Sequence, residues 1–400
     1  MSDLRLGTTG LARGTARLAF DAVEQLTRVV EGMHANIAAG PAPLGRGSDG
    51  RRSGVSGLVY RTIRLMNGTA REGIDQGLAW LPPGEARAPS PQGDVLRSVL
   101  NGVVGDHLAA TSNPLAIPMG LHHAGRRLPN APDALSAALS TARSRLLVLV
   151  HGLCMNERQW RREAHDHGAA LGHALGMTPV YVRYNSGRHI SENGRELSAQ
   201  LEQLRSAWPA PLDDITLLAH SMGGLVARSA IHEAELRRYT WRDRLRSVAF
   251  LGTPHHGAPL ERVGSWFEGA LGWSSYTAPL ARLGMLRSAG ITDLRYGSIH
   301  AADLEGRDRF ARRGDTRRSV PLPADVACFA LAASLGHGAT DPKHLVGDGL
   351  VPLASALGRH DDPEKCLDFP KARRWVGRRM GHFDLLSSRD AAAQLIRWLR

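Results

Sequence analysis

The stretch LLAHSMGGLVARSA places a serine where an apolar run ends and a helical pattern begins. Ser221 has Ala219 two residues before it and Gly223 two residues after it, and His220 precedes it directly. A nucleophilic serine on a sharp strand–turn–helix needs small residues at those two positions, because the backbones come close together there. Gly224 leaves further room in the first helical turn. The spacing therefore predicts a reactive serine supported by Ala219, His220, Gly223 and Gly224.

A second small-x-Ser-x-Gly pattern centres on Ser334, so the pattern alone does not identify the nucleophile. The residues after Ser221, GGLVARSAIHEAEL, form a helical pattern, whereas those after Ser334, GHGATDPKHLVGDG, form a loop pattern. Because a nucleophile turn must lead into a helix, we expect Ser221 rather than Ser334 to react.

Acyl transfer also needs two backbone N–H groups that bind the oxyanion of the tetrahedral intermediate. The segment VLVHGLCMNERQW ends a second apolar run at His151 and Gly152. Gly152 lets the chain turn tightly toward the serine, so we expect the N–H groups of Leu153 and Met222 to form the oxyanion pair. His151, Gly152 and Cys154 are candidates to line the substrate pocket. An ordinary strand-to-helix turn with a structural histidine is the alternative interpretation.

An acid and a base follow later in the chain. Asp348 lies in the turn-like segment VGDGLVPLASALG, and His382 lies in RRMGHFDLLSS before a C-terminal helical pattern. A carboxylate can orient an imidazole and stabilise its charged form, so we expect Ser221, Asp348 and His382 to act as nucleophile, acid and base. His255 and His256 follow LGTP at another expected strand end and are further substrate-pocket candidates, with structural roles as the alternative.

Alternating apolar runs and helical stretches begin at about residue 145. These runs predict strands that lie near one another in a parallel sheet with helices on both faces, at 145–150, 179–184, 214–220, 245–252 and 325–334. Expected helices include 196–208 and 224–236. The aromatic-containing segment 257–323 interrupts this rhythm, and its length predicts a cap or lid.

The N-terminal part of the sequence has a different residue pattern. We expect residues 1–140 to form a helical extension with Gly- and Pro-rich linkers, and residues 141–400 to form the catalytic domain. Apolar residues at spacings of three and four predict helices over 23–37 and 55–81, with a flexible linker at 40–54. A helical hairpin that covers an apolar surface of the main domain is our first interpretation. An interfacial membrane helix or a dimerisation arm is the alternative.

Composition limits the class of protein. The chain has 400 residues, of which 42% are hydrophobic, and a net charge of +12 at pH 7. Nearly all the positive charge comes from arginine, without a basic block interleaved with aromatic residues, so we do not expect nucleic-acid binding. The three cysteines have no CxxC spacing, and we expect no metal and no organic cofactor. The absence of a signal-peptide pattern and of an 18-residue apolar run predicts a cytoplasmic protein.

Several motifs together carry a family resemblance. The segments LLVLVHG, LLAHSMGGLVAR, LGTPHHGAP, GDGLVPLASA and GHFDLL resemble the esterase and lipase branch of the α/β-hydrolase superfamily, in particular the bacterial lipases and the GPI inositol-deacylase-like group. The resemblance covers residues 144–400. It implies an α/β-hydrolase fold, the triad and oxyanion donors named above, and Ala219 in place of the commoner glycine, as in some bacterial lipases.

These observations predict a serine carboxylic-ester hydrolase that forms an acyl-enzyme intermediate on esters with an apolar acyl group. The expected partner is therefore a small-molecule or lipid ester, and the alternative interpretation of the N-terminal helices would add peripheral membrane contact through them. An acyltransferase, thioesterase or amidase that uses the same triad remains an alternative, as does a non-catalytic binding protein on a hydrolase fold. The sequence makes no prediction of oligomeric state.

Overall fold

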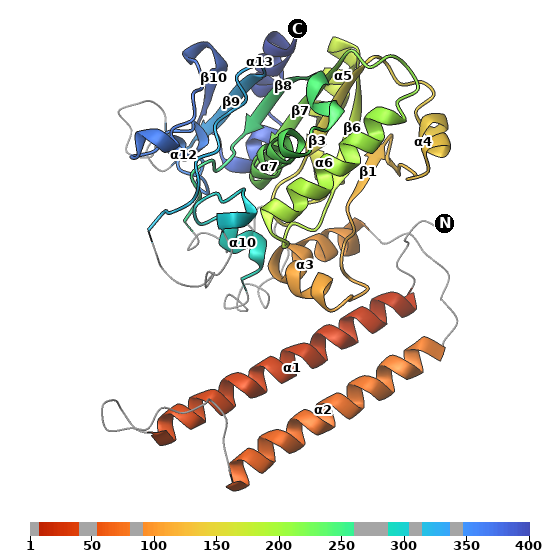
Figure 1. Cartoon of the computed structure of the whole chain (residues 1–400), viewed down its shortest axis with the longest axis vertical. Helices are drawn as coiled ribbons and strands as arrows, with labels where there is room; N and C mark the ends of the chain where they lie inside the picture. The colour runs from red at the N-terminus through yellow and green to blue at the C-terminus, as the bar shows by residue number, and fades with distance from the viewer. Residues whose placement is uncertain (1–7, 40–53, 81–90, 260–286, 304–313, 337–346) are drawn as a thin grey trace. The chain divides into compact units, whose positions relative to one another are not determined.

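The computed structural model describes six segments of the chain, which are residues 8–39, 54–80, 91–259, 287–303, 314–336 and 347–400 (Figure 1). Most of the expected lid lies outside these segments, including Trp266, Phe267, Trp273 and Tyr276, and so does nearly all of the expected 40–54 linker. Contacts divide the chain into two compact units. One comprises Met1–Pro91 with Leu108–Ala116, and the other comprises Gln92–His107 with Ile117–Arg400.

The helices of the described segments have the following bounds: α1 Thr8–Ala39, α2 Gly54–Trp80, α3 Pro91–Ala110, α4 Pro132–Ala138, α5 His167–Leu175, α6 Ile190–Ser206, α7 Met222–Arg237, α10 Ala289–Asp293, α12 Leu353–Ala356 and α13 Arg389–Leu399. Figure 1 shows α6 and α7 side by side in front of the sheet. Helices α5 and α13 pack against each other. None of the described helices is long and apolar enough to cross a membrane.

In the first unit, α1 and α2 lie antiparallel and are joined by ion pairs. Asp75 accepts hydrogen bonds from Arg13 (2.5 and 2.7 Å) and from Arg17 (2.7 and 2.6 Å). Hydrogen bonds from these two guanidinium groups, with that of Arg13 the largest effect, lower the pKa of Asp75 below its usual value. At the other end of the pair, Arg64 of α2 contacts Glu31 of α1.

Several apolar residues of the two expected stripes are exposed in this unit, namely Val23, Ile63, Met66 and Ile74. Exposed apolar side chains of this kind suit a surface that meets another apolar surface. The surface that these side chains meet, in the main domain, a membrane or a second copy of the chain, stays a prediction.

The second unit is built on an eight-stranded sheet with the order β10-β9-β8-β7-β3-β6-β1-β2. The strands are β1 Gly120–His123, β2 Arg126–Arg127, β3 Arg145–Val150, β6 Met177–Arg183, β7 Asp214–His220, β8 Leu245–Leu251, β9 Ala327–Ser334 and β10 Arg374–Arg378, and a separate two-stranded sheet pairs β4 Arg161–Arg162 with β5 His165–Asp166. The six strands from β10 to β6 run parallel, whereas β1 and β2 are antiparallel. The predicted mostly parallel α/β-hydrolase-type sheet is thus confirmed.

The central strands are buried because their sequences are almost wholly apolar. Every residue of β7 is buried, and so is β3 from its second residue onward. Register aligns Val150 at the end of β3 with Ala219 of β7, and Ala219 in turn with Phe250 of β8. The carboxyl ends of three neighbouring strands therefore meet at one edge, which is where functional residues gather in sheets of this type.

Helix α3 departs from the sequence-based division at residue 140. Its residues 92–107 belong to the same unit as the sheet. Arg183 of β6 binds Asp94 of α3 (2.6 Å), and Asn185 donates its amide hydrogen to the carbonyl oxygen of Gly105 (2.8 Å). The expected domain boundary between residues 140 and 141 therefore differs from the boundary of this unit, because polar side chains bind α3 to the loops of the sheet.

Candidate active site

Ser221 occupies a strained turn between β7 and α7. Its φ of 57° and ψ of −130° lie in a region that residues with a side chain seldom adopt. The Ser221 N–H donates to the carbonyl oxygen of Leu251 (2.8 Å), and the N–H of Gly224 donates to the carbonyl oxygen of Ser221 (2.9 Å). These bonds hold the turn against the end of β8. The Ser221 hydroxyl is buried and accepts or donates no hydrogen bond among the described residues.

The small residues around Ser221 are crowded as the sequence predicts. A Cβ atom on Gly223 would overlap the carbonyl oxygens of Val150 and His151, and one on Gly224 would overlap the side chain of Thr253. Because neither the backbone at Val150 and His151 nor the side chain of Thr253 can move away without a large cost in energy, both positions require glycine. Ala219, two residues before the serine, is fully buried within β7.

Asp348 and His382 form a buried pair. The Nδ1 atom of His382 lies 2.6 Å from Oδ2 of Asp348. The other carboxylate oxygen, Oδ1, accepts the N–H groups of Leu350 (3.0 Å) and Val351 (2.8 Å). Since an ionised carboxylate can only accept, Nδ1 of His382 carries the proton, and the basic lone pair of the neutral ring lies on Nε2. The arrangement fixes both the orientation and the tautomer of the imidazole.

The end of β8 brings the serine turn and the histidine together. The Leu251 carbonyl oxygen binds the N–H of Ser221, and the next residue, Gly252, lies against the ring of His382: a Cβ on Gly252 would be 3.1 Å from Nδ1. The His220 and His382 rings are also in contact, with centroids 4.7 Å apart and Nε2 of His220 3.3 Å from the His382 carbonyl oxygen. The three residues predicted as a triad therefore gather at one sheet edge, although they are far apart in sequence.

The predicted oxyanion donors flank the serine. A Cβ on Gly152 would be 2.9 Å from Cβ of Ser221, so the chain just before Leu153 lies beside the serine side chain. Met222 is the first residue of α7, and N–H groups in the first turn of a helix lack intrahelical acceptors. The positive end of the helix dipole at this point also favours developing negative charge.

The loop that carries Leu153 is held from several sides. The Tyr184 hydroxyl donates to the carbonyl oxygen of His151 (2.7 Å), and the Cys154 N–H donates to Oγ of Ser186 (3.0 Å). Cys154 adopts a positive φ of 61° and packs against Gly102 of α3, where a Cβ would overlap its sulfur. Sequence reasoning missed this role of α3, because its pattern carries no catalytic motif.

Burial keeps the neighbouring titratable groups neutral. It lowers the pKa of His151 to about 4 and the pKa of His220 well below its usual value. It raises the pKa of the Cys154 thiol, so this cysteine is not a competing nucleophile. A neutral His220 places no positive charge beside the imidazolium that His382 must form during acyl transfer.

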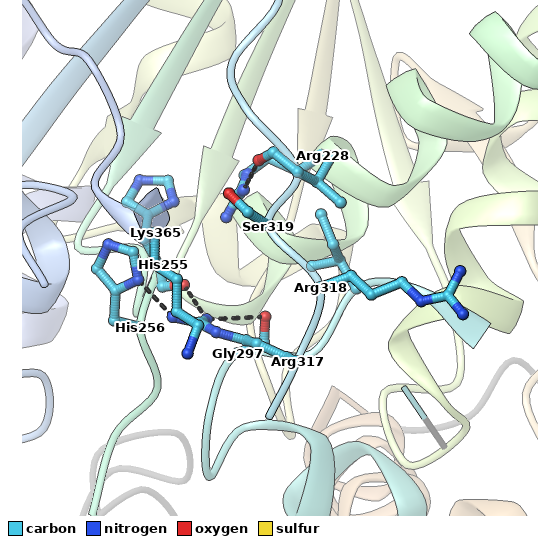
Figure 2. Close-up of a pocket in the computed structure, with 10 residues that line it drawn as sticks. Arg228, His255, His256, Gly297, Arg317, Arg318, Ser319 and Lys365 are labelled. Atoms are coloured by element: carbon cyan, nitrogen blue, oxygen red, sulfur yellow. Dashed lines mark hydrogen bonds between the residues drawn. The ribbon is translucent and has the colours of Figure 1, made fainter. Parts of the chain in front are cut away.

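His255 and His256 lie in another place. His255 is fully buried between Phe250 and Phe369, with ring centroids 4.8 and 5.3 Å away. Nδ1 of His256 accepts a hydrogen bond from the Arg317 guanidinium (2.5 Å). Both line a pocket whose described lining includes no triad residue (Figure 2). Their assignment to the substrate pocket stays a prediction. Within the described segments, no group of three or more His, Cys, Asp or Glu residues could hold a metal ion.

Comparison with known families identifies part of this unit. Residues 142–269 match the model of the PGAP1-like alpha/beta domain. The matched residues contain the Ser221 turn and the Leu153 loop, whereas Asp348 and His382 lie beyond them. A search of curated proteins finds no match.

Solved structures with similar folds are lipases and esterases by their titles. The mature lipase BlEst2 of Bacillus licheniformis is 18% identical, with 63% of this chain and 91% of that chain covered and a TM-score of 0.41. The esterase Pf2001 of Pyrococcus furiosus is 12% identical, with 64% and 82% covered and a TM-score of 0.36. Aspergillus fumigatus lipase B is 12% identical, with 63% and 50% covered and a TM-score of 0.36. Because these TM-scores are below 0.5, the fold assignment rests on the strand order and the matched domain.

Proposed function

We propose that this chain is a serine hydrolase of carboxylic esters. The observation that carries the proposal is that the buried His382–Asp348 pair and the strained Ser221 turn both lie against the end of β8. A hydroxyl in such a turn, a base with a fixed tautomer and two N–H groups at a helix start are the parts that acyl transfer requires. A purely structural serine would satisfy its hydroxyl when buried.

In the proposed mechanism, Nε2 of His382 takes the Ser221 proton as Oγ attacks the ester carbonyl carbon. Asp348 stabilises the imidazolium through Nδ1, and the N–H groups of Leu153 and Met222 bind the oxyanion. His382 then gives its proton to the departing alcohol, which leaves an acyl group on Ser221. A water molecule, deprotonated by His382, attacks this acyl-enzyme and releases the acid, and the hydroxyl of Ser221 recovers its proton.

Access to the site bears on the substrate. Both Ser221 and His382 are almost completely buried, so a substrate reaches Oγ only if a covering segment moves. The aromatic residues of the 257–323 segment in the sequence support a preference for esters with an apolar acyl part. Transfer to another alcohol, or cleavage of a thioester or amide, would use the same residues.

The test compares hydrolysis of p-nitrophenyl acetate, butyrate and octanoate by the wild-type chain, Ser221→Ala and the control variant Ser334→Ala. We expect Ser221→Ala to lose at least about a thousandfold in kcat/KM and Ser334→Ala to keep wild-type activity. Unchanged hydrolysis by Ser221→Ala would remove the assignment. Product analysis with a competing alcohol separates hydrolysis from acyl transfer.

A further inference from the structure

A second site lies in the same unit and is rich in positive charge. Figure 2 shows a pocket lined by Arg228, His255, His256, Gly297, Ile299, Arg317, Arg318, Ser319, Val320 and Lys365. Its lining contains four basic side chains, two histidines and no carboxylate. The pocket is partly enclosed, and its empty volume, with the open mouth included, is about 290 Å³. The lining chemistry is that of an anion site.

Arg228 is the deepest charge in the pocket. It is 8% exposed, and burial, followed by the charge of Arg317, lowers its pKa to about 9. One guanidinium nitrogen, Nη2, donates to the carbonyl oxygen of Val320 (2.5 Å), whereas Nε has no acceptor among the described residues. No described carboxylate lies within ion-pair distance of Arg228, although a buried charge is costly unless it is paired.

His255 presents a second unsatisfied group. Its ring is fully buried, and neither Nδ1 nor Nε2 has a hydrogen-bond partner among the described residues. Burial, together with Arg228, lowers the pKa of His255 well below its usual value, so the ring is neutral and keeps one N–H donor. Buried polar atoms in proteins are almost always satisfied, and a polar ligand in this pocket would satisfy both residues.

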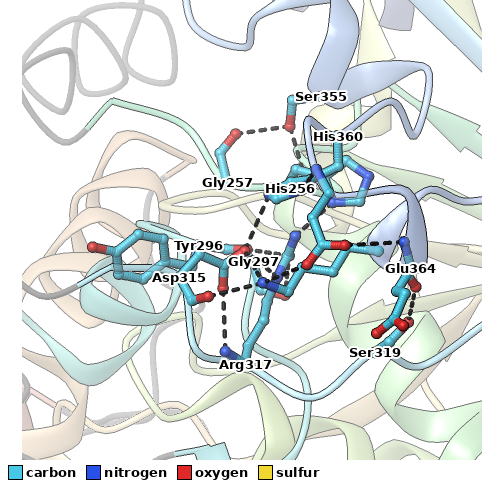
Figure 3. A network of polar contacts seen from close by, with 12 residues as sticks. His256, Gly257, Tyr296, Gly297, Asp315, Arg317, Ser319, Ser355, His360 and Glu364 are labelled. Carbon is cyan, nitrogen blue, oxygen red and sulfur yellow. Dashed lines mark hydrogen bonds and ion pairs between the residues drawn. The ribbon is translucent and has the colours of Figure 1, made fainter.

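Two other cations of the pocket, Arg317 and Lys365, already have a carboxylate partner. Figure 3 shows Arg317 bound to Asp315 (3.1 Å), and the same guanidinium donates to the carbonyl oxygen of His255 (2.8 Å). Lys365 lies 3.6 Å from Asp315. The carboxylate of Asp303 accepts the backbone N–H of Arg318 (2.9 Å). Among the described residues of the pocket, the buried charge without a carboxylate partner is therefore that of Arg228.

We propose that this pocket binds a phosphate group, supplied either as a soluble phosphate or as the headgroup of a lipid. One phosphate oxygen enters the pocket and accepts from Nε–H of Arg228 and from the ring N–H of His255. The remaining oxygens lie at the mouth, where Arg318, Ser319 and Lys365 offer donors. Arginine suits this role because its fixed N–H groups match phosphate oxygens.

The site is separate from the proposed nucleophile. Arg228 follows Ser221 by seven residues along α7, which corresponds to roughly 10 Å of helix. Phosphate binding can therefore be measured without reference to ester hydrolysis. Its failure would leave the proposed hydrolase function intact, and failure of the hydrolase proposal would leave the phosphate site intact.

The test measures phosphate binding to the full chain by calorimetry and by thermal unfolding in buffers of matched ionic strength. We expect inorganic phosphate to bind and raise Tm, and chloride to do neither. Arg228→Met should weaken phosphate binding about tenfold or more, and Arg318→Gln at the mouth about threefold. Arg246→Gln, which alters an exposed arginine outside the pocket, should bind phosphate as the wild type does.

Vesicles distinguish the two sources. If the ligand is a lipid headgroup, vesicles of phosphatidylcholine with phosphatidic acid should retain the wild type but not Arg228→Met, and soluble phosphate should compete. If the ligand is soluble, only inorganic phosphate should bind in a way that depends on Arg228. Equal effects of chloride and phosphate on the wild type would overturn the proposal. So would wild-type phosphate binding in both Arg228→Met and Arg318→Gln, and the second of these keeps the test valid if the first variant does not fold.

Discussion

Replacement of Asp348 by asparagine tests the role of the carboxylate without removing the turn it supports. In Asp348→Asn, the amide oxygen can still accept the N–H groups of Leu350 and Val351, which now bind Oδ1 at 3.0 and 2.8 Å. The amide NH₂ then replaces Oδ2 and faces Nδ1 of His382, now 2.6 Å away. Because NH₂ can only donate, the imidazole must place its proton on Nε2 and loses its basic lone pair there.

The expected cost follows from this tautomer change. Loss of the orienting carboxylate in a triad lowers kcat by about 10⁴, which corresponds to roughly 5 kcal/mol of transition-state stabilisation. The free energy of unfolding should change by less than about 1 kcal/mol, since both backbone hydrogen bonds survive. Asp348→Ala should lose activity as well, and it should also lose about 2–4 kcal/mol of stability because two buried N–H groups are left without an acceptor.

The assay is the initial rate of p-nitrophenyl butyrate hydrolysis, with the rate of fluorophosphonate labelling as a second measure that does not depend on substrate preference. Urea unfolding of both variants gives the stability comparison. If Asp348→Asn kept more than about a tenth of the wild-type rate, the tautomer argument and the assignment of Asp348 would be refuted.

Three further predictions follow from the described contacts. Gly223→Ala should reduce activity by at least about a hundredfold and lower the free energy of unfolding by about 2–4 kcal/mol, because the added Cβ overlaps the backbone at the end of β3. Ester-hydrolysis kinetics and urea unfolding measure these two effects. Wild-type values for both would contradict the crowding at Gly223. His151 has a pKa of about 4 in the folded protein, below its unfolded value of about 6.5, so the free energy of unfolding falls as pH drops from 6.5 toward 4. At pH 5 this histidine alone lowers the free energy of unfolding by about 2 kcal/mol. Urea unfolding of His151→Gln should therefore show a correspondingly smaller loss of stability between pH 7 and pH 5. Removal of residues 1–81 should abolish flotation with liposomes if the exposed apolar side chains of α1 and α2 bind lipid, and flotation that persists would assign membrane contact to the other unit.

The sequence predicts the sheet and the turn at Ser221 well because their constraints are local. A serine between Ala219 and Gly223 after an apolar strand can adopt few turn conformations, and the apolar runs from residue 145 onward predict the strands of the parallel sheet. Asp348 could be placed because the turn sequence GDG comes after the loop that follows the 325–334 strand pattern. The strands β3, β7 and β8 accordingly lie close to their expected bounds.

Other parts depend on long-range contacts that no local pattern encodes. Helix α3 packs onto the Cys154 loop through Gly102, which in the sequence is only a glycine within a helical stretch. Strand β10 is short and charged, RWVGR, and is a strand because it pairs with β9. His255 lies beside Arg228 because α7 and the loop after β8 meet in space, so the positive pocket was not visible in the sequence.

The most direct test of the central claim is to locate the adduct that a fluorophosphonate forms. After labelling of the intact chain, peptide mass spectrometry should find the phosphonate on Ser221 in the wild type and in Ser334→Ala. It should find no adduct in Ser221→Ala and a labelling rate reduced by at least about a thousandfold in His382→Ala. An adduct on any other residue, or labelling of Ser221 at an unchanged rate without His382, would contradict the account.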